Sequence, residues 1–137
     1  MTISLSRDDH RRWLVAQAEG ELTIDDVINF LQTARASDDA RTWPLLFDTQ
    51  GATTSMVADD VDRVVDVVRG MAAAGIERAH VAIVAAEDRL FAWLLLYEAK
   101  CEAIGVRVIR IFRQRMDAER WLDIMSATPG SLRSPRP

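Results

Sequence analysis

Residues 80–105 read HVAIVAAEDRLFAWLLLYEAKCEAIG, and this stretch decides the fold class. Residues 80–86 form a short apolar run, which is typical of a strand that is buried on both faces. Glu87 and Asp88 then open an apolar helix that runs to about Ile104 and stops at Gly105. A buried strand that leads directly into a helix predicts a parallel sheet with crossover helices.

The same alternation of strand and helix surrounds this stretch. Before it, residues 44–47 (PLLF) form another short apolar run, and the valines of residues 57–71 recur at the spacing of an amphipathic helix. Residues 49–56 between them are predicted to be a loop. After the stretch, residues 106–112 predict a strand and residues 117–125 a short helix with an apolar stripe.

The first part of the chain predicts an antiparallel hairpin. Residues 2–7 alternate apolar and polar side chains, and residues 13–18 are largely apolar on both faces, which places the second strand inside the sheet. Thr23 then caps a helix whose first turn contains Asp25 and Asp26. The predicted order is ββαβαβαβα, a single-domain α/β fold with a mixed sheet, an N-terminal antiparallel hairpin and packed helices.

The bulk properties of the chain fit one globular domain. The 137 residues have an ordinary composition, with 49% hydrophobic and 28% charged residues. We expect the domain to cover residues 1–127, and the Ser-, Pro- and Arg-rich residues 128–137 to be disordered. The net charge of −4 argues against a nucleic-acid partner, because domains that bind nucleic acids are usually basic.

Neither a leader nor a membrane segment is predicted. The first ten residues contain no apolar run, and the apolar residues 90–97 are far fewer than the roughly 20 that span a bilayer. We therefore expect no transmembrane segment and a cytoplasmic location. Cys101 is the only cysteine, so no internal disulfide forms, and its place on an apolar helix stripe predicts a buried, inert thiol.

No arrangement of residues predicts catalysis. His10 and His80 belong to no metal-binding spacing, and the chain has no nucleophile elbow. The acidic pair at residues 8–9, with Asp48 as phosphoacceptor, offers a receiver domain as an alternative. A receiver has no initial hairpin, however, and needs a lysine at the end of a late strand, whereas Lys100 lies in mid-helix. We expect a protein that is not an enzyme, with no catalytic residues, metal or cofactor.

Several segments resemble the SpoIIAA-like family of STAS-type domains, which is related to CRAL-TRIO-like lipid-binding folds. The resemblance covers nearly all of residues 1–126. It implies a STAS-type fold and two possible roles, the docking of a partner protein or the binding of a small apolar molecule. The segments that carry it are residues 20–22, LLFDTQG at 45–51, VAIVA at 81–85 and VRVIRIFRQRMDAERWL at 106–122.

The resemblance also implies where a regulatory switch would lie. Anti-sigma-factor antagonists of STAS type are switched by phosphorylation of a serine at the start of the helix after the strand that ends here in Asp48. This chain has no Asp-Ser-Ser-Gly or Asp-Ser-Thr-Gly motif, and the switch position falls near Val57. The nearest hydroxyl groups belong to Thr53, Thr54 and Ser55.

The segment after Asp48 is the first candidate site. Asp48 stands at the carboxyl end of a predicted parallel strand, and hydroxyl groups lead from it to a helix N-terminus, a place where α/β proteins bind ligands and anions. A phosphate or carboxylate would fit there, and a kinase could modify a hydroxyl. In the simpler interpretation, Ser55 or Thr54 only caps the helix. The candidate ligand- or partner-binding residues are Asp48, Thr49, Gln50, Gly51, Thr53, Thr54 and Ser55.

The helix that contains residues 90–97 is the second candidate, because it is apolar almost all the way round. One face is expected to pack on the core, and the second face has three interpretations. A neighbouring helix covers it and leaves Trp93 partly exposed, a homodimer forms through Trp93 and Leu96, or a hydrophobic ligand lies against Phe91 and Leu95. The residues of the core stripe are Leu90, Leu94, Tyr97, Cys101 and Ile104.

Together these features predict a non-enzymatic regulatory or binding module. It would dock a protein partner, form a homodimer and sense a small ligand near residues 48–57 and 88–104. The alternative is a carrier of a small hydrophobic, lipid-like ligand of the CRAL-TRIO-like kind.

Overall fold

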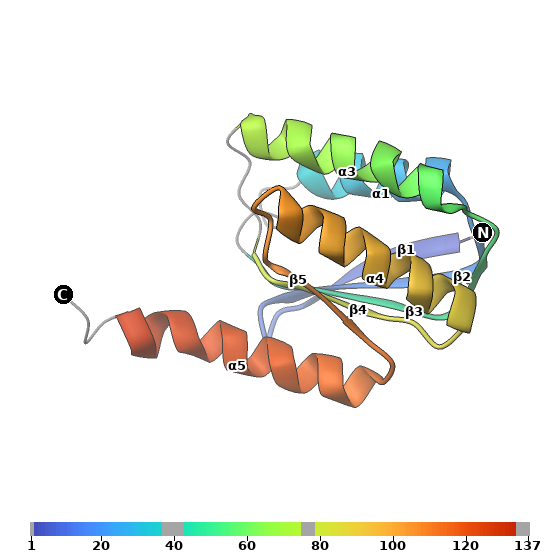
Figure 1. Cartoon of the computed structure of the whole chain (residues 1–137). Helices are drawn as coiled ribbons and strands as arrows, with labels where there is room; N and C mark the ends of the chain where they lie inside the picture. Colours follow the sequence, from blue (N-terminus) through green and yellow to red (C-terminus); the bar gives the residue numbers. More distant parts are fainter. Residues whose placement is uncertain (1, 37–42, 75–78, 134–137) are drawn as a thin grey trace.

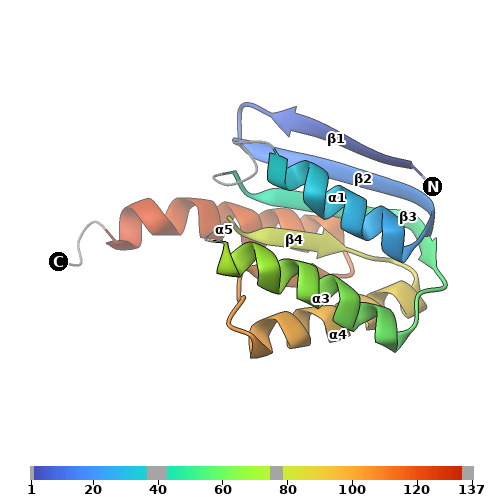
Figure 2. The same cartoon turned by 90° about the horizontal axis from the view of Figure 1, so that it is seen from above.

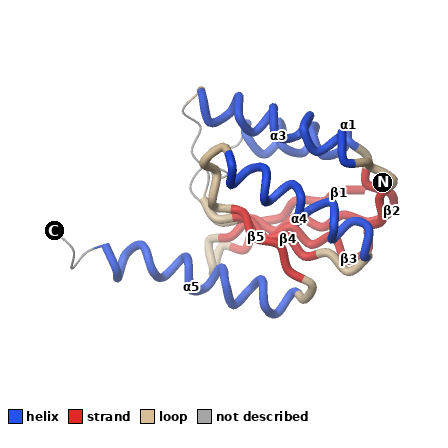
Figure 3. The backbone as a smooth tube through the Cα atoms, viewed as in Figure 1, coloured by secondary structure: helices blue, strands red, loops and turns tan. Residues whose placement is uncertain are grey.

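The structure is a computed structural model that describes residues 2–36, 43–74 and 79–133. Its elements follow the predicted order ββαβαβαβα, and Figure 3 shows the strands as one layer between helices. The strands are β1 (Thr2–Asp8), β2 (Trp13–Leu22), β3 (Leu45–Thr54), β4 (Val81–Val84) and β5 (Ile109–Phe112). The helices are α1 (Ile24–Ala36), α3 (Ala58–Ala73), α4 (Asp88–Ala103) and α5 (Arg115–Arg133).

The five strands form one mixed sheet in the order β1-β2-β3-β4-β5. The hairpin β1–β2 is antiparallel, and all later pairs are parallel, as predicted. Because successive parallel strands are neighbours and their crossovers share one hand, the crossover helices α1, α3 and α4 lie on the same face. Helix α5 covers the opposite face (Figure 1).

The core has two parts of unequal size. The larger part fills the space between the sheet and the three crossover helices, and it includes Leu14 and Ala16 from the inner face of β2. The smaller part lies under α5, where Trp13 and Leu46 from the sheet meet Ala118 and Leu122 from the helix. The alternation of side chains along β2 therefore supplies both faces, which confirms that this strand lies inside the sheet.

Strand β3 is longer than predicted, and this corrects the interpretation of residues 49–56 as a loop. The strand continues to Thr54, and its second half pairs with an equally extended β2 beyond an irregularity between Gln17 and Glu19. A Cβ atom at Gly51 would lie 3.2 Å from Cγ of Glu19, so glycine suits this close approach. Polar residues form this strand because a neighbouring strand satisfies their backbone hydrogen bonds.

Helix α5 is also longer than predicted. It begins at Arg115 and continues to Arg133, whereas the sequence pattern predicted a helix over residues 117–125. Residues 128–133, which we assigned to a disordered tail, are thus helical, and residues 134–137 lie outside the described residues. The last turns project beyond the sheet in Figure 1, so no apolar stripe in the sequence marks them. No helix in the described part of the chain combines the length and apolarity that crossing a membrane requires.

Candidate functional site

Helix α4 is covered on both faces in its first half. Leu90, Leu94, Tyr97 and Cys101 are buried against the sheet side, as predicted. Trp93 is only 6% exposed, so the prediction that its side chain is partly exposed is wrong. The dimer interface through Trp93 and Leu96 stays a prediction. The indole Nε1 donates a hydrogen bond to the carbonyl oxygen of Val57 at 3.0 Å, because the start of α3 packs over this position. The start of α3 therefore covers the Trp93 side of the second face.

An apolar surface remains outside the contact between α3 and α4. Val57 is 53% exposed, Leu95 41% and Leu96 36%. Two contacts with α3 flank Leu96 on helix α4. One turn before it, the Trp93 indole contacts Val57, and one turn after it, Lys100 forms an ion pair with Asp62. Leu96 thus lies along the junction of the two helices. We call Val57 and Leu96 the α3–α4 surface; Leu95, four residues after Phe91, lies on the other side of α4.

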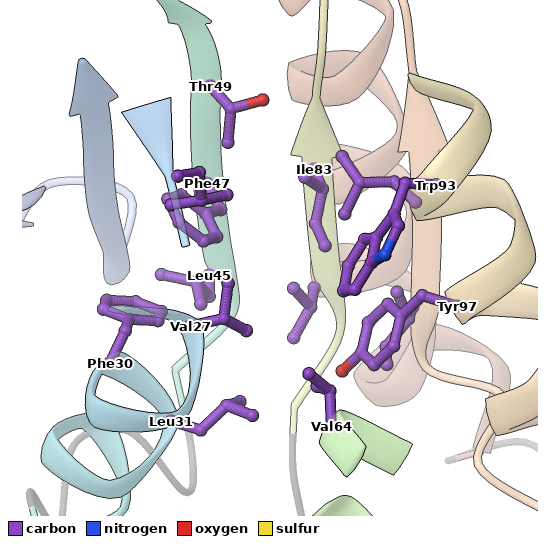
Figure 4. Close-up of a pocket in the computed structure, with 14 residues that line it drawn as sticks. Val27, Phe30, Leu31, Leu45, Phe47, Thr49, Val64, Ile83, Trp93 and Tyr97 are labelled. Carbon is purple, nitrogen blue, oxygen red and sulfur yellow. The ribbon is translucent and has the colours of Figure 1, made fainter. Parts of the chain in front are cut away.

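A small cavity lies between the sheet and the crossover helices (Figure 4). Its volume is about 40 Å³, and nearly all of its lining is apolar, including Phe47, Ile83, Trp93 and Tyr97. This volume has room for about two or three water molecules, whereas pockets for drug-sized ligands measure about 300–1,000 Å³. Phe91 and Leu95, the predicted ligand contacts, are not among the described residues that line the cavity.

Phe91 instead lies at the end of the sheet near the start of α5. The guanidinium of Arg113 stacks over its ring at 4.0 Å from the centroid. Arg113 also forms an ion pair with Asp88 at 2.8 Å and donates to the carbonyl oxygen of Ala86 at 2.8 Å. Phe91 therefore belongs to a contact that ties the loop after β5 to the start of α4.

Asp48 and Thr49 point to opposite faces of the sheet. The buried Asp48 carboxylate faces α5, where Oδ2 accepts from Arg115 Nη1 at 3.0 Å and Oδ1 accepts from the backbone N–H of Gln50 at 2.9 Å. The Thr49 hydroxyl donates to the carbonyl oxygen of Val84 at 2.6 Å on the other side. The structure thus separates these two side chains instead of bringing them to one ligand.

The hydroxyl groups of residues 53–55 do not cap α3. Thr54 donates to the carbonyl oxygen of Leu22 at 2.8 Å, and Ser55 donates to the Glu21 carboxylate at 2.9 Å. The N-cap residue is Val57, whose backbone N–H donates to the Asp60 carboxylate at 3.0 Å, so the expected cap by Thr54 or Ser55 is wrong. Gln50, Gly51, Thr53 and Ser55 are exposed along the β2–β3 extension.

A chain of ion pairs links Asp48 to the first hairpin, and the sequence analysis missed it. Arg115 bonds both Asp48 and Glu119, and Glu119 also accepts from Arg11 at 2.9 Å. These hydrogen bonds, from Arg11 above all, hold the pKa of Glu119 below its ordinary value. The four-residue spacing of Arg115 and Glu119 on one helix could have predicted their ion pair from the sequence. The ion pair with Asp48 could not have been predicted in this way, because 67 residues separate Asp48 from Arg115.

The acidic residues of the first turn have local partners. Asp8 accepts a hydrogen bond from the backbone N–H of Arg11 at 3.0 Å, and Asp9 lies 3.4 Å from the Arg7 guanidinium.

The His80 ring lies nearly perpendicular to the Trp121 ring, and burial lowers the pKa of its imidazole. In the described part of the chain, no three His, Cys, Asp or Glu side chains gather closely enough to hold a metal ion.

Comparison with known proteins identifies the fold. No family model matches the chain, and no curated protein matches it. A solved structure from Shewanella loihica PV-4, an uncharacterized protein from the DUF3478 family with a SpoIIAA-like fold, does match. The TM-score is 0.52 and the sequence identity 20%, over 88% of this chain and 92% of that chain. The chain has a SpoIIAA-like fold. This confirms the fold that the sequence resemblance implied.

Val57, the switch position that the sequence resemblance implies, is the N-cap residue of α3. That position, Val57, carries no hydroxyl group and is the most exposed residue of the α3–α4 surface. The hydroxyls of Thr53 and Ser55 lie just before it, on the exposed side of the chain. Modification of either hydroxyl stays a prediction.

Proposed function

We propose that this protein is a non-enzymatic regulatory module that docks a partner protein on the α3–α4 surface. Two large apolar side chains, Val57 and Leu96, are exposed there, although most apolar residues of the two helices are buried. Ion pairs and polar groups surround them, including Lys100 with Asp62 and the exposed hydroxyl of Ser55. An apolar centre with a polar rim is the usual composition of a protein interface.

The observation that carries the proposal is the hydrogen bond between Trp93 and the carbonyl oxygen of Val57. It fixes the first turn of α3 against α4 and thereby holds Val57 and Leu96 on either side of one rigid junction. A surface that is ordered before binding costs less entropy to dock. The exposed apolar side chains are therefore presented in a fixed arrangement.

The polar groups of the first candidate site also favour docking over chemistry. Asp48, Thr49 and Thr54 are buried, and each is hydrogen-bonded to a neighbouring segment of the chain. Groups that are already satisfied in the interior are poorly placed to bind a substrate. Residues Gln50, Gly51, Thr53 and Ser55 remain available at the surface as a second contact for the partner, in a cytoplasmic setting.

The test is a binding experiment with matched variants. Leu96→Asp places a charge in the centre of the α3–α4 surface, and Met116→Asp makes the same change at a residue that is 70% exposed on α5. We expect a partner that is purified with the wild-type chain and then titrated by calorimetry to lose at least about tenfold in affinity with Leu96→Asp. Met116→Asp should bind like the wild type. Equal affinity of all three proteins would contradict the proposal.

A carrier of a hydrophobic ligand is the second candidate, because the cavity in Figure 4 is apolar. Its volume of about 40 Å³ requires α1 and α4 to move apart before a lipid-like molecule could enter. Trp93→Ala would enlarge the cavity from one wall. A carrier predicts that apolar material is retained by the wild-type chain and released on denaturation, whereas the docking module retains none.

A further inference from the structure

The two edges of the sheet differ in how they are covered. At the β5 edge, α4 packs alongside the strand. Burial raises the pKa of Glu98 of α4, and the charge of Arg110 of β5 lowers it in part. Helix α4 therefore covers the β5 edge. The β1 edge lies at the outer margin of the sheet in Figure 2.

Strand β1 has few of the features that usually protect an edge strand. Such strands are commonly short, bulged or interrupted by proline or charged side chains, because their unpaired backbone groups invite another strand. In β1 the charged residues Arg7 and Asp8 lie only at one end. Strand β1 is seven residues long, TISLSRD, and pairs with β2 in continuous register from Thr2 to Asp8. Leu5, at its middle, is 43% exposed. The strand is therefore a regular edge that offers backbone groups and an apolar side chain.

A groove runs along the inner side of this edge. It lies between β1 and α1 and has a volume of about 240 Å³. Its lining is mixed, with apolar side chains from β1 and both polar side chains and Phe30 from α1. The lining residues are Ile3, Leu5, Asp26, Asn29, Phe30 and Thr33.

We propose that a second copy of this chain pairs with β1 in antiparallel register, with the two-fold axis beside Leu5. This pairing would join two sheets of five strands into one continuous sheet of ten. A two-fold axis brings the same strand from each copy together, so the surface needs to be complementary only to itself. The middle residue of a seven-residue strand allows pairing over its whole length.

The register about Leu5 also brings side chains of opposite charge together. It places Arg7 of the second copy opposite Ile3, and Ile3 shares its groove with Asp26. In the single chain the Arg7 guanidinium lies 4.7 Å from the centroid of the Trp43 ring and 3.4 Å from Asp9. On pairing, it would exchange these contacts for one over Ile3 with the Asp26 carboxylate of the other copy, whose Oδ2 also accepts from Thr23. Two symmetric Arg–Asp contacts result, one at each end of the paired strands. Ser4 faces Ser6 of the second copy on the opposite side of the sheet, where hydroxyl pairs are favourable.

The apolar part of the interface is formed by the two Leu5 side chains. Directly opposite residues of an antiparallel pair have Cβ atoms about 4.5–5.5 Å apart, so the two side chains contact each other over the groove. Each then covers apolar surface of Ile3 and Phe30 that the single chain leaves open to the groove. A second copy thus supplies backbone, apolar and charged partners to the same edge.

The first test is the molar mass of the full chain across a dilution series, by analytical ultracentrifugation. We expect a dimer, and we expect Leu5→Lys to raise its dissociation constant by about tenfold or more, because two ammonium groups would meet at the axis. Leu96→Asp is the matched control and should leave the dimer intact. Circular dichroism should show the same secondary structure for all three proteins. A wild-type monomer, or a dimer that survives Leu5→Lys, would overturn the proposal.

The second test fixes the register and does not depend on a disruptive variant. Leu5→Cys should form a disulfide-linked dimer with oxidised glutathione as the oxidant, because directly opposite Cα atoms lie within disulfide range. Ser4→Cys should not, since the two copies of residue 4 would be diagonal neighbours about 7–8 Å apart. Cross-linking through residue 4 and not residue 5 would overturn the register.

The pairing of two copies through β1 can fail its test while partner docking on the α3–α4 surface passes, and the reverse. Partner docking is tested at Leu96 and pairing of copies at Leu5, on different sides of the helical layer. A dimer that Leu96→Asp abolishes and Leu5→Lys does not would overturn the pairing through β1 and move the interface to the α3–α4 surface.

Discussion

Helix α4 on one face of the sheet and helix α5 on the other are held by different interactions. Leu90, Trp93 and Leu94 of α4 are buried in the larger core, among the sheet and the other crossover helices. Helix α5 buries Ala118 and Leu122 in a smaller core and adds the ion pairs of Arg115 with Asp48 and Glu119. The crossover layer therefore depends mainly on apolar burial, and the α5 layer depends also on charge.

The difference has a functional consequence. The apolar stripes of α3 and α4 are used in the core, so the few exposed apolar side chains at their junction are conspicuous. Helix α5 exposes Met116 and Ile124, but its attachment to the sheet rests in part on the half-buried ion pair of Arg115 with Glu119. A rigid layer is the better platform for docking, and this favours the α3–α4 surface over α5.

The largest expected effect comes from the apolar layer. Leu90 is fully buried, and Leu90→Ala should lower the free energy of unfolding by about 2–5 kcal/mol, because it leaves a cavity under α4. Leu95→Ala removes the same atoms from an exposed position of the same helix and should change it by less than about 0.5 kcal/mol. Urea unfolding measures both. Equal effects of the two variants would mean that α4 does not pack as described.

A smaller effect is expected where charge attaches α5. Arg115→Met leaves the buried Asp48 carboxylate without its cationic partner and should cost about 1–3 kcal/mol. Asp48→Asn removes the buried charge and keeps an acceptor for the Gln50 backbone, so it should cost less, about 1 kcal/mol. Urea unfolding again compares the two variants. If Asp48→Asn lowered the free energy of unfolding more than Arg115→Met, the ion pair itself would be the main source of stability, and not the avoidance of an unpaired buried charge.

The smallest expected effect is a dependence on pH. The folded protein holds the pKa of Glu119 below its ordinary value. The ionised carboxylate therefore stabilises the fold fully when the pH is above the ordinary pKa of a glutamate. This stabilisation is lost as the pH falls through the lower pKa of the folded state. The melting temperature should therefore fall less between pH 5 and pH 3 in Glu119→Gln than in the wild type. The lowered pKa of Asp26 contributes in both proteins and cancels in the comparison. Parallel curves would contradict the assigned role of Glu119.

The sequence predicted the features that depend on local patterns. The short apolar runs at residues 44–47 and 80–86 each lie in or around a parallel strand, and Thr23 caps α1 as expected, with its hydroxyl accepting from the backbone N–H of Asp26. The alternation along residues 13–18 gave the two faces of β2 correctly. These patterns reflect burial of the segment itself, which its own composition records.

The features that it missed depend on distant partners. Trp93 is buried because α3 crosses over it, and a helical wheel for α4 contains no information on α3. Residues 49–54 form a strand because β2 extends beside them, although their own composition is that of a loop. Asp48 looked like a ligand at a strand end, and its true partner, Arg115, follows two strands later. The candidate site was therefore less predictable than the fold.

The central claim is that the interior is closed and that the protein acts through its outer surfaces. Native mass spectrometry of the protein as purified, with a denatured control, tests it most directly. We expect twice the chain mass under native conditions and no added mass. An added mass that disappears on denaturation would contradict it, because the apolar cavity would then be a ligand site and the protein a carrier.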